Sequence, residues 1–266
     1  MAVLAVGTSS MVFRPMLLGC SVLIIAAVVD PVYGLGPLLG TLLLGWGSYL
    51  GLIFRDPPRR IPSEDGLAVA PIDGRVVAVR RERATGRRPL PEEPAPLDEA
   101  SEAGAWTGTG GPSDTSFGPE QRWVADEAGD VWCVRLHAGP LDVHVHRAPF
   151  EGTITTAEHR LPSTKGSLSH PERFRWAVHG PHGHAEVTVH RGGPRLALIP
   201  YVGLDEAVRR GQRLGLLARA SFVDVRVSAQ VWKPEDSLLH ASDLGNRQEV
   251  VAGTSVLFRM EKKEEE

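Results

Sequence analysis

This 266-residue sequence contains little cysteine, and it has no strong excess of charge of either sign. Its two cysteines, Cys20 and Cys133, are too few for a disulfide framework or a cysteine-rich zinc site. The net charge of −3 gives no electrostatic reason to expect a nucleic-acid partner. These shortages exclude disulfide-stapled, zinc-finger and nucleic-acid-binding classes, and the 42% hydrophobic content indicates a globular chain.

Charge is also missing from two long runs near the N-terminus. Residues 16–29 are almost wholly apolar and residues 32–54 carry no charge, with Asp30-Pro31 between them. A run of about 20 apolar residues is enough to cross a bilayer as a helix. The sequence therefore predicts a transmembrane helical hairpin within a membrane anchor at 1–56. A cleaved signal peptide and a buried hydrophobic hairpin are the alternatives.

Basic residues flank this hairpin on both sides. Arg14 precedes it, and Arg55, Arg59 and Arg60 follow it. Because positive charge is retained on the cytoplasmic side, both ends of the hairpin are expected there. The domain that follows is then expected to face the cytoplasm from the cell (inner) membrane. The same arginines after the hairpin are candidates for contact with lipid phosphates.

Short alternating segments separated by Gly- and Pro-containing turns dominate the remainder of the chain. This pattern is typical of an antiparallel β barrel or sandwich. The predicted fold class is α+β, mainly β, with the helical hairpin followed by a β domain over 57–260. A largely disordered surface loop is expected over 84–121, which is rich in Pro, Gly, Glu and Ser. Residues 261–266 form a charged tail, and one short helix is expected around 204–211.

Polar side chains suited to chemistry gather in the segment DVHVHR, residues 142–147. On a strand, Asp142, His144 and His146 share one face, while the two valines share the other. Two histidines need further ligands to hold a metal, and nothing in the sequence marks them, so no metal site is predicted. Asp73, in the turn PIDG, is by itself ordinary turn chemistry.

Four segments occur in a fixed order: IFRDPPRRIP after the apolar runs, then APIDGRV, then LDVHVHRAPFEG, then GQRLGLL followed by Ser221 and a VD pair. This order resembles the shorter bacterial form of the phosphatidylserine decarboxylase family. Members of that family carry FFRDP-x-R-x-x-P, SPADG-like, DVH-x-x-RAP and G-x-RFG-x-x-x-FGSRVD stretches. Four ordered motifs are far more specific than any one of them. The resemblance covers roughly residues 17–80 and 130–227.

The resemblance implies a zymogen that cuts its own backbone between Ala220 and Ser221. In this family the serine attacks the carbonyl in front of it, and the serine residue ends as an N-terminal pyruvoyl cofactor. An alcohol needs a positioned base, itself oriented by a carboxylate, to act as a nucleophile at neutral pH. Matching by motif position assigns Ser221 as the pyruvoyl precursor, His144 as the base and Asp73 as the carboxylate.

The same resemblance implies the reaction and the partners. The pyruvoyl carbonyl withdraws electrons as carbon dioxide leaves phosphatidylserine, giving phosphatidylethanolamine in a carboxy-lyase step of phospholipid biosynthesis. His144 is the expected proton donor, with His146 as the alternative base and Arg147 as a further auxiliary residue. The expected partners are a phospholipid substrate in the membrane and the two cleaved chains, which are expected to stay associated with each other. A homo-oligomer is left open.

The chain departs from the family pattern at the cut. Alanine stands at position 220 where the family has glycine, and Phe222 stands where a basic residue is usual. A left-handed backbone at Ala220 would cost roughly 1 kcal/mol or more and would slow the cut. A non-cleaving, inactive member of the same family is therefore the main alternative, followed by a tethered Ser-His-Asp hydrolase and a lipoyl-like carrier domain. The lipid head group also stays open, because LIPYVGLDEAVRRG replaces the family's pocket stretch.

Overall fold

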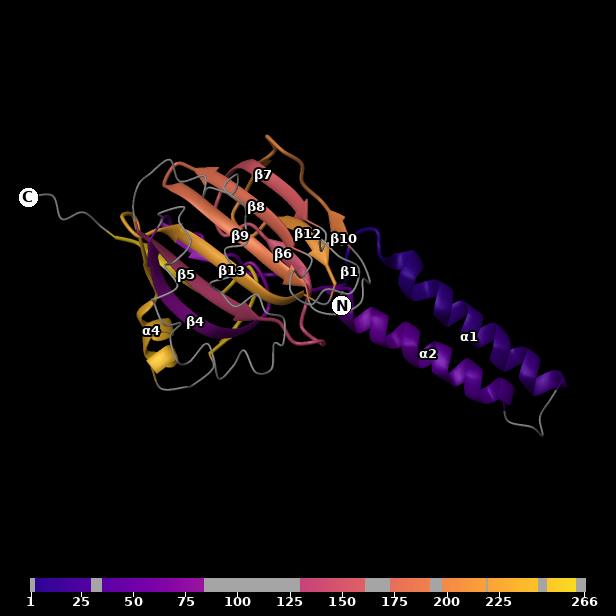
Figure 1. The fold of residues 1–266 in the computed structure, drawn as a ribbon. Helices are drawn as coiled ribbons and strands as arrows, with labels where there is room; N and C mark the ends of the chain where they lie inside the picture. Colours follow the sequence, from indigo (N-terminus) through magenta and orange to yellow (C-terminus); the bar gives the residue numbers. More distant parts are fainter. Residues whose placement is uncertain are drawn as a thin grey trace, which may run out of the picture.

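A helical hairpin projects from one end of a curled antiparallel β domain (Figure 1). This arrangement confirms the expected class, a mainly β fold behind an N-terminal helical hairpin. The expected loop at 84–121 and the tail beyond Glu261 lie outside the described residues. The computed structural model describes residues 3–29, 35–83, 130–160, 173–191, 198–218, 220–243 and 248–261.

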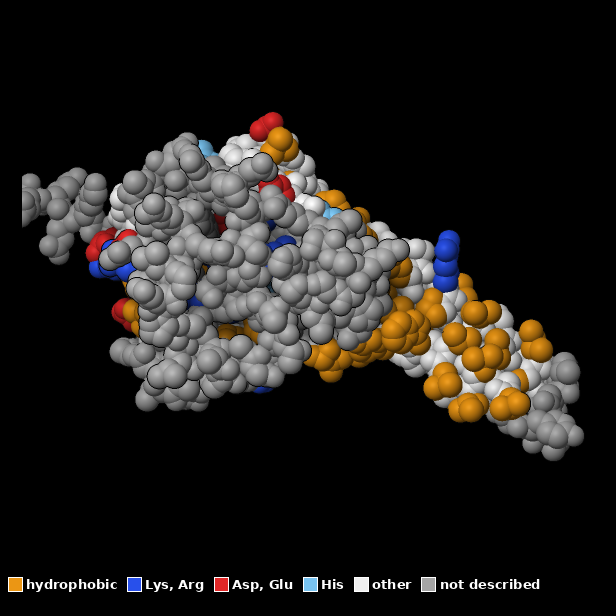
Figure 2. Space-filling model, in the orientation of Figure 1, with side chains coloured by type: hydrophobic (Ala, Val, Ile, Leu, Met, Phe, Trp, Pro, Cys, Tyr) orange, Lys and Arg blue, Asp and Glu red, His pale blue; other side chains and the backbone are white. Residues whose placement is uncertain are grey.

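The two hydrophobic runs form long helices that lie side by side, α1 (Ser9–Val29) and α2 (Leu35–Ile53). Both are long and apolar enough to cross a membrane, over Ser9–Ala27 and Leu35–Ile53. Only 17% and 22% of these two spans are buried, so the alternative of a hydrophobic hairpin buried in a protein core is not supported. Hydrophobic side chains cover the hairpin and its junction with the β domain (Figure 2).

Small residues set the close approach of the two helices. A β-carbon added at Gly19 would lie 3.0 Å from the carbonyl oxygen of Gly40, and one added at Gly36 would lie 2.5 Å from the β-carbon of Ala26. By contrast, a β-carbon at Gly45 would meet nothing within 4 Å. The helices therefore pack backbone against backbone on one side, as helices in lipid commonly do.

A short ladder closes the base of the hairpin. β1 (Val3–Leu4) pairs antiparallel with β2 (Arg55–Asp56), so the residues before α1 lie beside the residues after α2. The Ala5 N–H extends the contact by donating to the Phe54 carbonyl at 2.7 Å. Both ends of the hairpin are thus fixed to one another at the surface of the β domain.

An apolar cluster joins the hairpin base to the β domain, and we call it the anchor cluster. Its buried members come from both ends of the hairpin and from the strands that carry the motifs: Ala5, Val12, Leu50, Ile53, Phe54, Val143, Val145, Leu216 and Ala218. Val143 and Val145 both belong to this cluster, in agreement with the expectation that the two valines share one face, although the strand itself begins only at Val145. The back of this segment therefore rests on the hairpin.

The largest sheet has eight strands in the order β11-β7-β8-β9-β13-β5-β4-β15, and every neighbouring pair is antiparallel. Its central strands are long and its edge strands are short. In sequence order these are β4 (Gly74–Arg83), β5 (Asp130–His137), β7 (Gly152–Arg160), β8 (Arg173–Gly180), β9 (Gly183–Arg191), β11 (Ala207–Val208), β13 (Ala220–Ser228) and β15 (Glu249–Val250).

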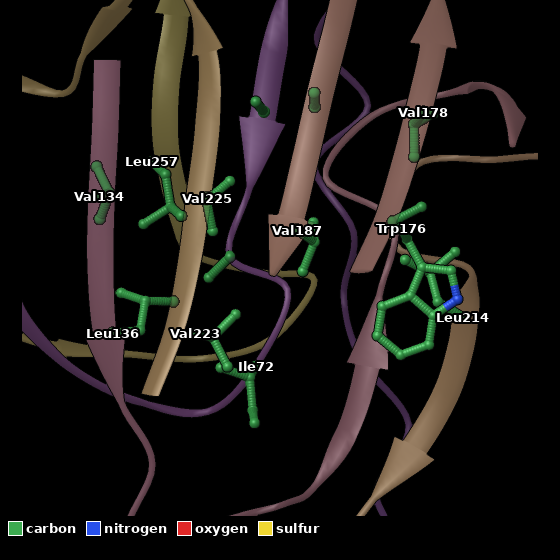
Figure 3. Close-up of a cluster of buried hydrophobic side chains, with 14 of the residues drawn as sticks. Ile72, Val134, Leu136, Trp176, Val178, Val187, Leu214, Val223, Val225 and Leu257 are labelled. Carbon is green, nitrogen blue, oxygen red and sulfur yellow. The ribbon is translucent and has the colours of Figure 1, made fainter. Parts of the chain in front are cut away.

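Two three-stranded sheets, in the orders β10-β12-β6 and β14-β16-β3, complete the β domain. Their strands are β3 (Leu67–Val69), β6 (Val145–Arg147), β10 (Leu198–Pro200), β12 (Arg213–Leu217), β14 (Trp232–Pro234) and β16 (Val256–Met260). Alternate residues of the large sheet, such as Val134, Val187 and Val225, point inward to meet Leu214 and Leu257 from the small sheets (Figure 3). The core therefore lies between the large sheet and the two small ones.

The helix expected around 204–211 is wrong. This segment instead contains β11, which pairs with β7, and the Asp205 N–H donates to the Ile154 carbonyl at 2.8 Å. Asp205 also adopts a left-handed φ of 62°, which interrupts a helix. The described helix outside the hairpin is α4 (Asp236–Asp243), an eight-residue element that the sequence pattern did not indicate.

Candidate active site

Backbone hydrogen bonds hold the motif segments against one another. The Arg147 N–H donates to the Pro71 carbonyl at 2.8 Å, which places the PIDG turn beside β6. The Leu217 N–H donates to the His144 carbonyl at 3.3 Å, which places the end of β12 beside the start of β6. The three predicted catalytic residues therefore belong to segments that the fold brings together.

Ser221 lies where the chain passes from a small sheet to the large one. β12 ends at Leu217, and β13 begins at Ala220. Two residues of β9 stand opposite the three residues from Ala220 to Phe222, so Ser221 is the extra residue of a β-bulge. Bulges are over-represented next to active sites because they change the direction of a strand and of its side chains.

Ala220 is the first residue of β13, and it stands opposite Arg191 of β9, directly before the bulge at Ser221. The effect of alanine in place of the family's glycine on the cut stays a prediction.

His144 is fully buried, and its tautomer follows from its partner. Its Nδ1 lies 2.6 Å from the carbonyl oxygen of Asp142. Since a carbonyl oxygen can only accept, Nδ1 carries the hydrogen and donates it. In the neutral ring, Nε2 is then the nitrogen that can take up a proton, as a general base must.

His146 is also fully buried, but its surroundings are apolar. Its ring centroid lies 5.7 Å from that of Trp176. Burial, reinforced by the nearby His144, lowers the pKa of His146 from 6.5 to about 3. A group with so low a pKa is a weak base at neutral pH, so His146 is poorly suited to act as the general base. The role of His144 as the base stays a prediction. No group of three or more His, Cys, Asp or Glu side chains in the described part of the chain is placed to hold a metal ion.

Asp73 is held at the PIDG turn by two donors. Its Oδ2 accepts from the Arg59 Nη2 at 2.6 Å, and its Oδ1 accepts from the Ala252 N–H at 2.8 Å. The Arg59 side chain is only 13% exposed, so it points into the protein, and the expected contact of Arg59 with lipid phosphates is not met. The role of Asp73 toward the base stays a prediction.

A second carboxylate, Asp56, links two further motifs, and sequence reasoning had not singled it out. Its Oδ1 accepts from the Arg147 Nη2 at 2.6 Å, and its Oδ2 accepts from the Arg213 Nε. Arg147 also donates to the Gly211 carbonyl at 3.0 Å. Arg147, predicted as an auxiliary residue, is thus engaged in joining the motif segments. The sequence feature that could have indicated this pairing is that each of the motifs containing Asp56, Arg147 and Arg213 carries an Asp or an Arg.

A third buried carboxylate, Asp224, fixes the strand that begins at the proposed cut. It accepts two hydrogen bonds from Arg135, at 2.6 and 2.7 Å, and lies 3.0 Å from the Nε2 of His190. Burial alone would raise the pKa of Asp224, but Arg135 and Arg226 outweigh it and hold this pKa well below its usual value. Asp224 is therefore ionised, and it anchors β13 to both of its neighbouring strands.

Comparison with known proteins matches the same segments. A family model described as phosphatidylserine decarboxylase matches residues 49–257. The phosphatidylserine decarboxylase proenzyme of Symbiobacterium thermophilum is 29% identical over 231 residues, which cover 84% of each chain. The relative of the same name from Salinibacter ruber is 29% identical over 234 residues, covering 85% of this chain and 81% of its own. A candidate archaetidylserine decarboxylase proenzyme from Methanopyrus kandleri is 28% identical over 194 residues, covering 71% of this chain and 75% of its own.

The range matched by the family model covers most of the chain and includes the four motif segments. It runs from the end of α2, through the PIDG turn and the DVHVHR segment, to β16. The order of the motifs, their contacts in the fold and the family match agree. The chain belongs to the phosphatidylserine decarboxylase family, a family of carboxy-lyases.

Proposed function

We propose that this chain is a membrane-anchored proenzyme that cuts itself between Ala220 and Ser221 and then converts phosphatidylserine to phosphatidylethanolamine. The observation that carries the proposal is the position of Ser221, the extra residue of a bulge that follows a strand bonded to the His144 backbone. The names of the relatives, which are proenzymes of serine-phospholipid decarboxylases, support the reaction class.

Self-cleavage begins with a proton transfer. His144 takes the hydroxyl proton of Ser221 on Nε2, while its Nδ1–H remains on the Asp142 carbonyl. The serine oxygen bonds to the carbonyl carbon of Ala220, the C–N bond breaks, and the proton passes to the leaving nitrogen, which gives an ester. Elimination of the ester's carboxylate splits the chain and leaves a dehydroalanine, whose hydrolysis releases ammonia and leaves the pyruvoyl group.

The residues around the new N-terminus fit a pyruvoyl group. The group would stand at the start of β13. The next residue, Phe222, pairs with His190 of β9 on one side and with His137 of β5 on the other. Bound there, its carbonyl supplies an electron sink for the decarboxylation. His144 is fully buried and its carbonyl is bonded to Leu217, so this ring can hold or return a proton away from bulk water.

The membrane placement rests on α1, α2 and the anchor cluster. Because Val143 and Val145 pack on the hairpin base, the DVHVHR segment is held next to the ends of the two candidate membrane spans. A lipid substrate then reaches the site without leaving the bilayer. Arg14, near the start of α1, and Arg55, just after α2, support a cytoplasmic position for both ends and for the β domain.

Intact mass under denaturing conditions tests the cut. A cut in front of Ser221 gives chains of 220 and 46 residues, the shorter one lighter by one ammonia than its sequence. Ser221→Ala should leave only the uncut 28.7 kDa chain and abolish decarboxylation. Ser228→Ala, a change at the far end of the same strand, should be cut like the wild type. A wild-type chain that stays uncut after long incubation would overturn the proposal.

A further inference from the structure

An open groove is lined by residues from the segment before α1 and from in and around the strands β10 and β12. These elements meet where the helical hairpin joins the β domain (Figure 1). Its volume is about 530 Å³. Most of its lining is apolar and comes from Val6 and Gly7, which precede α1, and from residues 199–202 at β10. Gln212 and Arg213, at the start of β12, supply its polar part.

Arg213 brings a surplus positive charge to this groove. Asp56 accepts from both Arg147 and Arg213, so one carboxylate is shared between two guanidinium groups. The Asp56 and Arg147 side chains are only 3% and 6% exposed, whereas the Arg213 side chain is 45% exposed. One carboxylate balances only one of the two guanidinium groups, so one positive charge remains. Because Arg213 is the more exposed of the two arginines, this charge is accessible to a ligand there.

The apolar wall of the groove is tied together by one hydrogen bond. The Tyr201 hydroxyl donates to the Val6 carbonyl at 3.1 Å, which links β10 to the segment before α1. Burial, together with the nearby Asp56, raises the pKa of Tyr201 to about 12, so this donor stays protonated. The Val6 side chain itself is 66% exposed. A surface apolar side chain next to a membrane helix is suited to contact with lipid rather than with water.

We propose that this groove binds a membrane phospholipid, with the lipid phosphate on Arg213 and one acyl chain along Val6 and Ile199. The candidate membrane span begins at Ser9, so the groove opens at the height where the span ends. A guanidinium group forms strong charge-assisted hydrogen bonds with phosphate. A small soluble anion would leave the apolar wall in water, and an uncharged apolar ligand would leave Arg213 unused.

The charged end of the groove and the candidate active site lie at opposite ends of β12. Arg213 is the first residue of this strand, and Leu217, which bonds to the His144 carbonyl, is the last. A strand of this length spans roughly 13 Å, which separates Arg213 from the site. The apolar wall of the groove runs along this strand toward the site, because Ile199 pairs with Leu216. The proposal rests on the proposed function in one respect, the placement of the hairpin in a membrane.

Lipid retention by the full chain tests the groove. The protein is extracted in mild detergent, incubated with phosphatidylglycerol, and its bound lipid is counted by native mass spectrometry. Arg213→Gln should weaken retention by about tenfold or more. Asp56 keeps its bond to Arg147 in this variant. Arg75→Gln is the matched control: Arg75 is 54% exposed, is paired with the single carboxylate of Glu249, and should retain lipid like the wild type.

A second variant tests the apolar wall without disturbing the Asp56 ion pairs. Val6→Asp places a carboxylate in the groove at an exposed position, and it should repel the lipid phosphate and weaken retention by a similar factor. Retention that is equal in the wild type and in both groove variants would overturn the proposal. A chain recovered without membranes would also overturn it.

The same samples keep this proposal separate from the proposed function, because intact mass reports the cut in front of Ser221. An uncut chain whose lipid retention still depends on Arg213 would support the lipid site and contradict the self-cleavage. A cut chain whose lipid retention does not depend on Arg213 would support the self-cleavage and contradict the lipid site.

Discussion

The conformation of Ala220 decides how much the alanine at the cut matters. Ala220 is part of strand β13, and the extended backbone of a strand is open to alanine as well as to glycine. We expect Ala220→Gly to change the rate of self-cleavage by less than about threefold, which is below 1 kcal/mol in the barrier. The loss of uncut chain after cell-free synthesis measures this rate. An increase of about tenfold or more would show that the reacting conformation is left-handed.

The buried His146 makes the stability of the fold depend on pH. Its pKa is lowered to about 3 in the folded state, so between pH 6.5 and 3 the unfolded chain binds a proton that the folded chain does not. The contribution of His146 to the stability is thus complete above about pH 6.5 and falls as the pH drops, by on the order of 5 kcal/mol in total. His190, whose pKa burial also lowers, adds to the same trend.

A replacement that cannot titrate isolates the contribution of His146. We expect His146→Leu to flatten the fall in thermal unfolding midpoint between pH 7 and pH 4.5, measured in detergent, without removing it, since His190 remains. His182→Leu, at the turn between β8 and β9, serves as the control and should keep the wild-type profile. An unchanged slope in His146→Leu would contradict the assignment.

Motif position assigned the candidate catalytic residues, but it did not indicate which side chains hold them in place. Asp73, His144 and Ser221 followed from ordered motifs, and the fold brings their segments together. Their partners are separated along the chain: the Arg59–Asp73 pair by 14 residues and the Arg213–Asp56 pair by 157. Such pairings depend on the folded arrangement of strands, which no local pattern contains.

Among the elements, long alternating strands were predictable and short ones were not. GTITTAEHR is one of the short segments between Gly- and Pro-containing turns that indicated a β domain, and it is β7 over its full length. The predicted helix at 204–211 failed because tertiary pairing with β7 outweighs a short helical pattern. β1 has only two residues, and its partner β2 lies beyond both helices, so its existence depends on closure of the hairpin.

The packing of α1 on α2 depends on which face a glycine occupies. A side chain at Gly19 would meet the Gly40 backbone, whereas one at Gly45 would enter open space. We expect Gly19→Leu to destabilise the hairpin by about 1–3 kcal/mol through overpacking. The thermal midpoint in detergent should fall for Gly19→Leu and stay unchanged for the matched Gly45→Leu. Equal midpoints for the two variants would contradict the observed helix interface.

At the scale of the whole molecule, the hairpin is part of the packing of the site as well as a tether. Phe54 is 1% exposed and shares the anchor cluster with Val143 and Val145. We expect Phe54→Ala to cost about 3–5 kcal/mol of stability and to slow self-cleavage, because the DVHVHR segment loses its support. Leu52 lies on α2, two residues before Phe54, and is 48% exposed. Leu52→Ala should therefore change neither the thermal midpoint nor the fraction of cut chain.

The central position of β13 determines what a cut in front of it would produce. This strand is hydrogen-bonded to β9 on one side and to β5 on the other, and it is followed by β14, β15 and β16, which pair within or into the sheets of the domain. The shorter product would therefore remain as a permanent second subunit. One translated chain would thereby mature into an obligate heterodimer, with its two subunits made in equal number and assembled before they are separated.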